Sequence, residues 1–370
     1  MIRLRILPML VSLFAVTSSA FAANPELSSA GLEQRVDFWK KVFTQYGEND
    51  IIIHDLYRVN LIYDVAADED ISSKLASVKD TLREMRAGLD SPETFSPAAT
   101  QIAESIAAQG LTLSDSLLAD LLSTVHTQRG IKERFRDGVI RSGRHVAEFR
   151  EILSKHNVPE ELALLPLVES SFQNVRSKAG AVGMWQFTRS TGRLYLKINS
   201  RVDERLDPSK AANAAARLLR SNYNALGNWP LAITAYNHGA GGMQRAQKSH
   251  GSEITTIIND YRGPVFGYAS MNFYAEFLAA VEVYNSYPTY FGELVLDQPG
   301  PRVQVAANVQ PKPAATAKPK TPAASSKYQV KKGDTLWEVA QRFGTSIRSL
   351  MELNKLNETA IYAGQILLVK

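Results

Sequence analysis

Residues 298–327 are the feature that most limits how this chain can fold. Six prolines are spread through the stretch among alanine, lysine, threonine and serine, and its few apolar residues follow no helix or strand period. Such a composition cannot bury a core and favours an extended, solvated linker. The sequence therefore predicts two separately folded bodies, one before residue 298 and one at residues 328–370.

The first 22 residues are predicted to be a secretory signal peptide. Arg3 and Arg5 precede an apolar run, and Ala20-Phe21-Ala22 has the small-x-small pattern of a cleavage site near Ala22. No other run is apolar and long enough for a membrane span. We therefore expect an exported, periplasmic protein.

Composition narrows the chemistry. The chain has no cysteine, which excludes a lipid anchor on an N-terminal cysteine, disulfides, thiol catalysis and cysteine-based zinc sites. The net charge of +5 falls to +3 once the signal peptide is removed, too small an excess to indicate nucleic acid binding but compatible with an acidic polymer such as cell wall. No metal or cofactor is predicted.

The body before the linker is predicted to be mainly α-helical. Apolar residues recur at helical spacing from Leu32 to Tyr46 and from Leu75 to Met85, and we interpret both stripes as packing faces. The β-branched run Ile51–Asp55 favours a short extended piece, in which His54 is interpreted as structural.

Further helices are expected where alanine and leucine are frequent. One begins near Asn157, its proposed N-cap, and the others lie at 208–226, 229–237 and 270–285. The body then divides into an N-terminal helical region at 23–127 and a following domain at 128–297.

Glu169 is the residue that most indicates chemistry. It lies near the end of the apolar run Leu162–Phe172, where Leu162, Leu165, Pro166 and Glu169 share one helix face. Three of the four are apolar, so the face points inward and carries Glu169 with it. Burial raises the pKa of a carboxyl group, so Glu169 could hold a proton near neutral pH and deliver it as a general acid. Alternatively, Glu169 tops the helix and meets an arginine or solvent.

Three motifs follow Glu169. Residues 177–187 combine small residues, which let a ligand approach the backbone, with apolar side chains and the amide of Gln186, which suit sugar rings. Tyr236-Asn237 opens a glycine-rich loop that follows no strand, so a nucleotide site is not indicated. Tyr274 is either core or a hydroxyl aimed into a cleft. Taken singly, each motif is also explained by turns and packing.

In this order and spacing, the motifs resemble the catalytic domain of soluble lytic transglycosylases over about residues 128–290. With a signal peptide before them and the C-terminal module after them, the chain is similar to the murein transglycosylase D family. The resemblance implies a lysozyme-like domain acting on peptidoglycan glycan strands, with Glu169 as the sole catalytic acid and base. The implied sugar contacts are Ser177, Met184, Gln186, Tyr236, Asn237 and Tyr274, the last being the tyrosine near Glu169.

Two departures from the family pattern affect this transfer of roles. Many relatives carry Glu-Thr four residues before that tyrosine, where this chain has Ser270-Met271, so a second helper carboxylate is not carried over. The interval from Glu169 to Ser177 is also one residue shorter than usual, which weakens the role of Ser177.

The resemblance implies that the MurNAc–GlcNAc β-1,4 bond is cleaved without water. Glu169 would protonate the leaving oxygen, and the N-acetyl group would stabilise the oxocarbenium-like intermediate. Glu169 would then take the proton of the MurNAc C6 hydroxyl, which attacks C1 to form a 1,6-anhydro ring. The nucleophile belongs to the substrate, so its effective concentration is high and one carboxylate suffices.

Two other functions stay open. A goose-type lysozyme has the same fold and cuts the same bond, but it needs a carboxylate that holds water. Asp203, Glu204 and Asp207 are the nearby candidates, which we interpret as solvated or paired with Arg201 and Arg205. The other alternative is an inactive peptidoglycan-binding scaffold, against which the intact motif residues argue.

The module at 328–370 is predicted to fold in the order β-α-α-β and resembles a LysM domain over its whole length. The signature comprises Tyr328-x-Val330-x-x-Gly333-Asp334-Thr335-Leu336, then Asn354, then Gly364-Gln365-Ile366-Leu367. The resemblance implies binding to glycan that contains N-acetylglucosamine. The implied groove residues are Gly333, Asp334, Thr335, Ile361, Tyr362 and Ala363.

Overall fold

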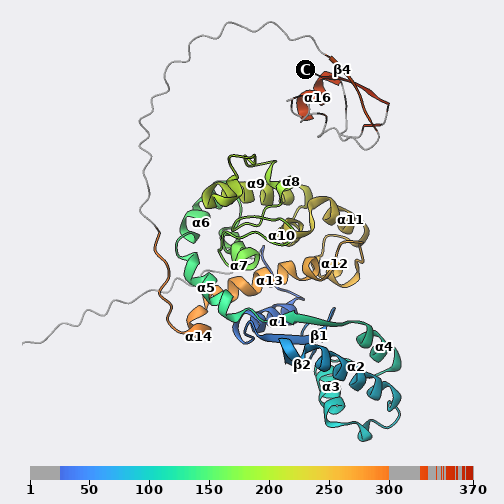
Figure 1. Ribbon diagram of the computed structural model, residues 1–370. Helices are drawn as coiled ribbons and strands as arrows, with labels where there is room; N and C mark the ends of the chain where they lie inside the picture. Colours follow the sequence, from blue (N-terminus) through green and yellow to red (C-terminus); the bar gives the residue numbers. More distant parts are fainter. Residues whose placement is uncertain are drawn as a thin grey trace, which may run out of the picture. The chain divides into compact units, whose positions relative to one another are not determined.

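The computed structural model describes residues 26–299 and, nearer the C-terminus, residues 326–331, 339, 343, 345, 347–354, 356, 361–362 and 364–369. The predicted signal peptide and nearly all of the predicted linker lie outside these residues. The chain forms two compact units, residues 1–301 and 302–370. The predicted fold class, mainly helical with a small C-terminal module, is confirmed (Figure 1).

A small antiparallel sheet stands near the start of the first unit. Its strands are β1 (Asp50–Asp55), β2 (Ile62–Ala67) and β3 (Val125–Arg129), in the order β2-β1-β3. The central strand β1 is the extended piece that the β-branched run predicts, and its Ile52 and Ile53 are fully buried. The sequence does not predict β2 and β3, because neither has a run of β-branched residues. They are held by pairing with β1, as where Ile52 lies opposite Val65 and Gln128.

Three helices pack beside this sheet and close a core of their own. They are α2 (Ile71–Ala87), α3 (Pro97–Ala108) and α4 (Asp115–Ser123). Ser96 and Ser114 are the N-caps of α3 and α4. Each side chain accepts a hydrogen bond from the backbone N–H three residues later in the sequence. The predicted stripe from Leu75 to Met85 supplies the α2 face of this core.

Helix α1 (Glu33–Thr44) belongs to the larger core of the unit rather than to the α2–α4 group. Its stripe packs along α13 (Tyr268–Asn285), and Arg35 Nη1 donates a hydrogen bond of 2.8 Å to Asn272 Oδ1. His54 is buried beside these helices, with Phe38 and Tyr268 against its ring, so its predicted structural role is confirmed. The chain before residue 128 therefore contributes to two cores.

Most of the remaining helices of the unit surround α7 (Leu165–Ser170), as Figure 1 shows. Expected helices appear as α9 (Pro208–Leu226), α10 (Trp229–His238) and α13, close to the predicted bounds. The others are α5 (Lys132–Ser142), α6 (Val146–Ser154), α8 (Arg189–Gly192), α11 (Ala240–His250), α12 (Ile254–Asp260) and α14 (Tyr287–Phe291), with the short 3-10 turns η1 (Asp68–Asp70), η2 (Pro92–Thr94), η3 (Glu160–Leu164) and η4 (Glu204–Leu206).

The predicted helix start at Asn157 is wrong. Asn157 has a left-handed backbone with φ of 53°, and Arg220 donates a hydrogen bond to its carbonyl. The segment begins instead as the 3-10 turn η3 and becomes α-helical only in α7 (Leu165–Ser170). Pro159 precedes η3 in an extended conformation, which breaks any continuous helix from Asn157.

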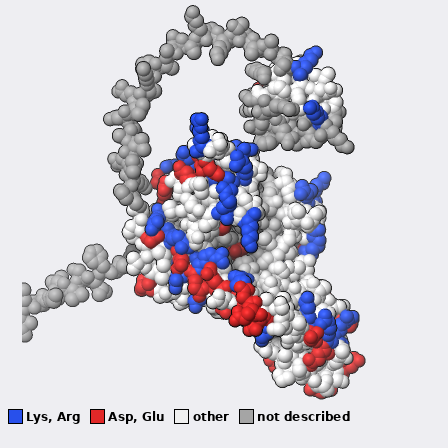
Figure 2. Space-filling view, in the orientation of Figure 1, with Lys and Arg blue, Asp and Glu red and all other residues white. Residues whose placement is uncertain are grey.

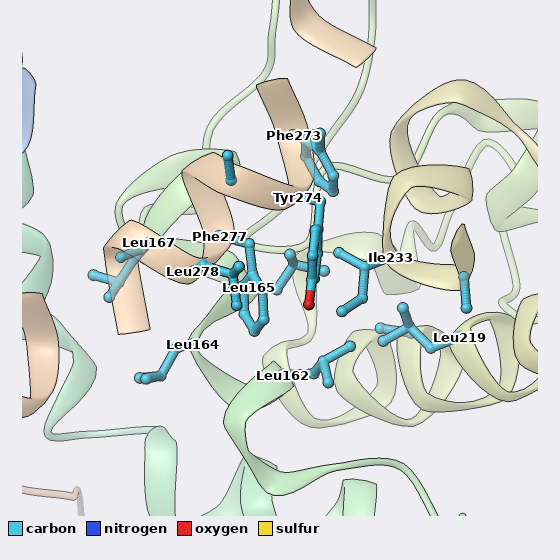
Figure 3. Close-up of a cluster of buried hydrophobic side chains, with 14 of the residues drawn as sticks. Leu162, Leu164, Leu165, Leu167, Leu219, Ile233, Phe273, Tyr274, Phe277 and Leu278 are labelled. Carbon is cyan, nitrogen blue, oxygen red and sulfur yellow. The ribbon is translucent and has the colours of Figure 1, made fainter. Parts of the chain in front are cut away.

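The inward face of η3 and α7 meets α13 in a tightly packed cluster (Figure 3). Leu162 and Leu165 are fully buried there, as predicted from their spacing with Glu169. Figure 3 shows the contributors from η3 and α7, from α9 and α10, and from α13: Leu162, Leu164, Leu165, Leu167, Leu219, Ile233, Phe273, Tyr274, Phe277 and Leu278. This packing fixes the direction of α7.

The described residues of the second unit form a two-stranded sheet and a helix. Strand β4 (Ser326–Gln329) pairs antiparallel with β5 (Ile366–Val369), and helix α16 (Ile347–Asn354) packs on β5. The Asn354 side chain bridges to the backbone of Leu368, accepting from its N–H at 2.6 Å and donating to its carbonyl at 2.8 Å. The predicted first helix of this module lies largely outside the described residues.

The surface of the first unit carries mixed charge. On the face shown in Figure 2, lysine and arginine are interspersed with aspartate and glutamate rather than gathered into one basic stripe. Several of these side chains form ion pairs, such as Arg86 with Asp115 and Lys74 with Asp64. Across the part of the chain that the structure describes, no helix is long and apolar enough to cross a membrane.

Candidate active site

Glu169 lies in the last turn of α7, next to an unusual helix end. Ser171 and Phe172 both have left-handed backbones, with φ of 51° and 57°. Such conformations cost about 1–3 kcal/mol each in residues other than glycine and persist only where the surroundings enforce them. Here Phe172 is buried, and Arg141 Nε donates a hydrogen bond of 2.9 Å to the Ser171 carbonyl. The chain therefore leaves α7 abruptly just beyond Glu169.

The Glu169 carboxyl group is set among protein atoms with little water around it. Burial raises its pKa to about 8, and no cation contributes to the shift. A carboxyl group with this pKa is protonated at neutral pH and can donate its proton to a developing alkoxide. The side chain is nevertheless half-buried rather than sealed in, so a ligand can reach it. The predicted inward orientation of Glu169 is consistent with this environment.

A hairpin-like loop at residues 176–187 is fastened to the residue after Glu169. Ser170 Oγ donates a hydrogen bond of 2.8 Å to the carbonyl of Met184. Glycine is required at position 183, because φ is +87° and a Cβ atom there would lie 1.9 Å from the Arg205 carbonyl oxygen. The small residues of this motif thus allow one backbone to approach another, and not only a ligand.

Gln186 and Ser177 shape this loop from within. Gln186 has a left-handed backbone with φ of 47°, and its Nε2 donates to the carbonyls of Val175 and Gly183. Ser177 Oγ accepts a hydrogen bond of 3.0 Å from the Ala181 N–H. Both polar side chains therefore stabilise the loop, and the side chain of Met184, also in the loop, is buried.

Helix α10 brings Tyr236 and Asn237 toward α7. The Tyr236 hydroxyl donates a hydrogen bond of 2.7 Å to the Trp185 carbonyl. Burial, and then the charge of Glu169, raise the pKa of Tyr236, which places its hydroxyl near that carboxyl group. Asn237 is exposed, and its Oδ1 accepts a hydrogen bond of 2.9 Å from Ser270 Oγ of α13.

Tyr274 does not line the cleft, which corrects the prediction that it contacts sugar. Its side chain is fully buried, and its hydroxyl donates a hydrogen bond of 3.0 Å to the Ser28 carbonyl. The neighbouring Phe273 faces α10 instead, parallel to the Tyr236 ring with centroids 6.5 Å apart. Adjacent residues of a helix point about 100° apart, so Phe273 and Tyr274 meet different neighbours.

Glu276 of α13 is the residue of this site that the motifs do not reveal. Burial raises its pKa to about 8, and the charge of Glu169 adds to the rise, so the two carboxyl groups lie near each other. The signal was available: Glu276 interrupts the apolar run of residues 273–280, much as Glu169 interrupts residues 162–172.

The acids considered for a hydrolase are engaged elsewhere. Asp203 forms a bidentate pair with the buried Arg205, as the interleaved arginines predict, while Glu204 pairs with Lys210. Asp207 caps α9 by accepting a hydrogen bond from the Lys210 N–H. The side-chain hydrogen bond from Arg205 lowers the pKa of Asp203, so the Asp203 carboxylate stays ionised and serves to hold Arg205.

A cavity of about 340 Å³ is lined by the start of α1 and by residues 57–60 and Asn259, without Glu169. Among the residues described here, no three His, Asp or Glu side chains converge as metal ligands would.

Most of the predicted LysM groove falls outside the described residues. Gly333, Asp334, Thr335 and Ala363 belong to that undescribed part. Ile361 is half-buried and packs against the core of the module. Tyr362 is 69% exposed, which leaves its ring available for a ligand.

Two domain families match the chain. The Transglycosylase SLT domain matches residues 148–259, and the LysM domain matches residues 328–370. The chain contains an SLT domain and a LysM domain. The SLT match includes Glu169, the 176–187 loop and Tyr236-Asn237, but it ends before α13 and so before Glu276.

Several relatives are similar to parts of the chain. The chain is 42% identical over 101 residues to Membrane-bound lytic murein transglycosylase D of Escherichia coli (strain K12), covering 26% of this chain and 22% of that protein. The protein of the same name from Escherichia coli O6:H1 gives the same values. A "Probable N-acetylmuramidase" of Lactococcus lactis subsp. cremoris is 50% identical over 42 residues, 11% of this chain and 10% of that protein. The chain thus spans about a fifth of the length of the first two relatives.

Proposed function

We propose that this protein is an exported peptidoglycan lytic transglycosylase, which cleaves the MurNAc–GlcNAc β-1,4 bond and leaves 1,6-anhydroMurNAc ends. The observation that carries the proposal is the carboxyl group of Glu169, whose pKa burial raises to about 8 and which is held inside the SLT domain at the end of α7 beside Tyr236. The relative named as a membrane-bound murein transglycosylase supports a location in the cell envelope, and we propose the periplasm.

In this mechanism Glu169 acts twice. As an acid, it protonates the glycosidic oxygen while the bond to C1 breaks and the substrate N-acetyl group stabilises the positive charge. As a carboxylate, it then takes the proton of the MurNAc C6 hydroxyl, whose oxygen closes on C1. No water enters the products, and Glu169 ends protonated, ready for another turnover.

The side chains around Glu169 would serve as a frame for the sugar. Tyr236 is held by the Trp185 carbonyl and stacks against Phe273, so it gives the cleft a rigid aromatic wall. Asn237, exposed and oriented by Ser270, would present its amide to an N-acetyl or hydroxyl group. Ser177, Met184 and Gln186 stay proposed contacts, formed by the loop 176–187.

One observation favours a second candidate, a hydrolase of the goose-type lysozyme class. Glu276 supplies a second carboxyl group near Glu169, and ordinary glycosidases use two. Against it, the raised pKa keeps Glu276 protonated at neutral pH, in which state it cannot activate water as a base.

The products decide between the two. We expect purified sacculi digested by the full-length protein to release muropeptides that end in 1,6-anhydroMurNAc, lighter by one water than lysozyme products. Mass spectrometry of unreduced digests measures this difference directly, and a lysozyme digest of the same sacculi gives the hydrated reference. Mainly reducing MurNAc ends would establish the hydrolase instead.

The rate of cleavage should also fall as the pH rises above neutrality. Because Glu169 must carry a proton to begin the reaction, and its pKa is about 8, turnover should fall as the pH rises through that value. Well above it, the loss should approach about tenfold per pH unit. Initial rates of sacculus solubilisation between pH 6 and 10 test this, and a flat profile across pH 8 would contradict it.

A further inference from the structure

Ser270 of α13 lies within hydrogen-bond distance of two side chains at the end of α10. It belongs to the first turn of α13, and only 6% of the residue is exposed. Its Oγ atom is 2.9 Å from Asn237 Oδ1 and 3.3 Å from His238 Nδ1. A serine hydroxyl carries one proton, so it can donate to only one of these two atoms.

The chemistry of the two neighbours fixes the direction of the hydrogen bonds. Asn237 Oδ1 is a carbonyl oxygen that can only accept, so Ser270 Oγ donates its proton there. The Ser270 oxygen can then accept a hydrogen bond, and His238 Nδ1–H is the group placed to donate it. The three side chains form a hydrogen-bonded series from His238 through Ser270 to Asn237, which we call the Ser270 relay.

The ring of His238, at the start of this relay, is confined by its surroundings. Phe266 packs against it edge to face, with the ring centroids 5.0 Å apart. Gly242 of α11 lies against the same ring, because a Cβ atom at position 242 would be 2.4 Å from His238 Nε2. Gly242 is inside a helix and has no left-handed backbone, so the space taken by the His238 ring is what requires glycine there.

We propose that Ser270 and His238 are positioning residues, which fix the polarity of the Asn237 side chain and thereby select a hydrogen-bond acceptor on the glycan. This inference rests on the proposed function, in which Asn237 contacts the sugar. Asn237 is exposed, and its Nδ2 amide group has no hydrogen-bond partner among residues 26–299. Because an amide N–H can only donate, the group it selects is an acceptor, such as the carbonyl oxygen of an N-acetyl group.

Fixing this polarity before the glycan arrives strengthens binding without adding a contact. The two ends of an asparagine amide have nearly the same shape, but one accepts hydrogen bonds and the other donates them. Without the Ser270 hydroxyl, the amide of Asn237 can turn over and present its oxygen to an oxygen of the ligand. The relay removes this unproductive arrangement, which is a gain by preorganisation. Ser270 is nearly buried, so it acts through Asn237 rather than on the sugar.

The first test is the full-length Ser270→Ala variant, assayed on soluble glycan strands of alternating GlcNAc and MurNAc. We expect KM to rise about fivefold while kcat changes little, since the loss is one restraint on a binding group. Ser270→Thr keeps the hydroxyl group and should retain most of the affinity. In an Asn237→Ala background, Ser270→Ala should raise KM no further, because the group that it positions is already gone.

Gly242→Ala tests the relay from its other end. The added Cβ atom displaces the His238 ring, so KM should rise about as much as in Ser270→Ala. Gly241→Ala is the matched control, because both glycines lie in the first turn of α11 and gain helix propensity alike. A Cβ atom at position 241 would come no closer than 3.9 Å to a neighbour, an Arg245 nitrogen, so its KM should equal the wild type.

The polarity itself is tested by comparing Asn237→Asp with Asn237→Ala. Aspartate keeps the shape of the side chain but replaces the N–H donors with an oxygen that only accepts. If the glycan presents an acceptor to residue 237, the KM of Asn237→Asp should be at least as high as that of Asn237→Ala. Thermal unfolding of every variant at the assay pH identifies any loss of folded protein.

Four results would overturn the inference. They are a wild-type KM for folded Ser270→Ala, a wild-type KM for Asn237→Ala, additive effects of these two substitutions, and tighter binding by Asn237→Asp than by Asn237→Ala. Each comparison uses glycan cleavage relative to the wild type, whichever ends the products carry. The proposed function is judged separately by the mass of the products and by Glu169→Gln, so the two can fail independently.

Discussion

Glu169→Gln should lower the rate of muropeptide release by about a thousandfold or more, because one side chain supplies both the acid and the base. Glutamine keeps the shape of the half-buried side chain and cannot transfer a proton. Since the buried carboxyl group is replaced by a neutral amide, the fold should be retained. Release of soluble muropeptides from sacculi, followed by chromatography and mass spectrometry, measures the loss.

The matched control for that experiment is Glu160→Gln. Glu160 begins the same segment in η3 and is exposed, so it shares the local sequence context without the buried setting. Its rate should equal the wild type, and both variants should sediment with sacculi as the wild type does. If Glu169→Gln releases products at the wild-type rate, Glu169 is not the catalytic residue and the proposed mechanism fails.

Deleting residues 298–370 should weaken sacculus binding by about tenfold or more while leaving the cleavage of short soluble glycans nearly unchanged. A second binding module raises the effective concentration of the first at a polymer, but a short glycan cannot bridge both. Cosedimentation over a range of sacculus concentrations measures the binding. Melting of the first unit should be nearly unchanged, since it forms a compact unit of its own.

A point variant separates the loss of glycan contact from the loss of the whole module. Tyr362 is highly exposed and lies in the expected groove, so Tyr362→Ala should weaken binding without unfolding the second unit. Tyr290→Ala, at an exposed tyrosine of α14, is the control for removing a surface ring. Tight sacculus binding by the deletion variant, or a much lower melting temperature, would contradict the tethered-module prediction.

The sequence predicts the inward direction of Glu169 because that direction follows from local periodicity. Three apolar neighbours on one helix face fix its direction before any tertiary contact is known, and the structure buries the same face against α13. The ranges of α9 and α10 follow for a similar reason, since Asp207 and Asn228 cap them and a left-handed Gly227 ends α9.

Helix α13 is predictable as a helix but not in its facing. Apolar residues surround it on nearly every side, so periodicity does not distinguish the side toward α1 from the side toward α10. The sequence therefore leaves Tyr274 as either core or a sugar contact, and the structure buries it completely; the setting of Glu276 is not predicted at all. The strands β2 and β3 are not predicted, because neither carries a strand-like sequence pattern. They are stabilised by backbone pairing with β1.

The packing of α1 on α13 sets a lower limit on the length of chain that can fold autonomously. A fragment cut to the matched residues 148–259 would lack both helices and leave the apolar flanks of α7 and α10 facing water. At the other end, the Asp297 N–H donates to the Ile140 carbonyl, and its carboxylate pairs with Arg144, which fastens the chain after α14 back onto α5. A fragment that keeps these contacts, together with the hydrogen bond from Tyr274 to the Ser28 carbonyl, runs from about Ser28 to Asp297, well over twice the length of the matched domain.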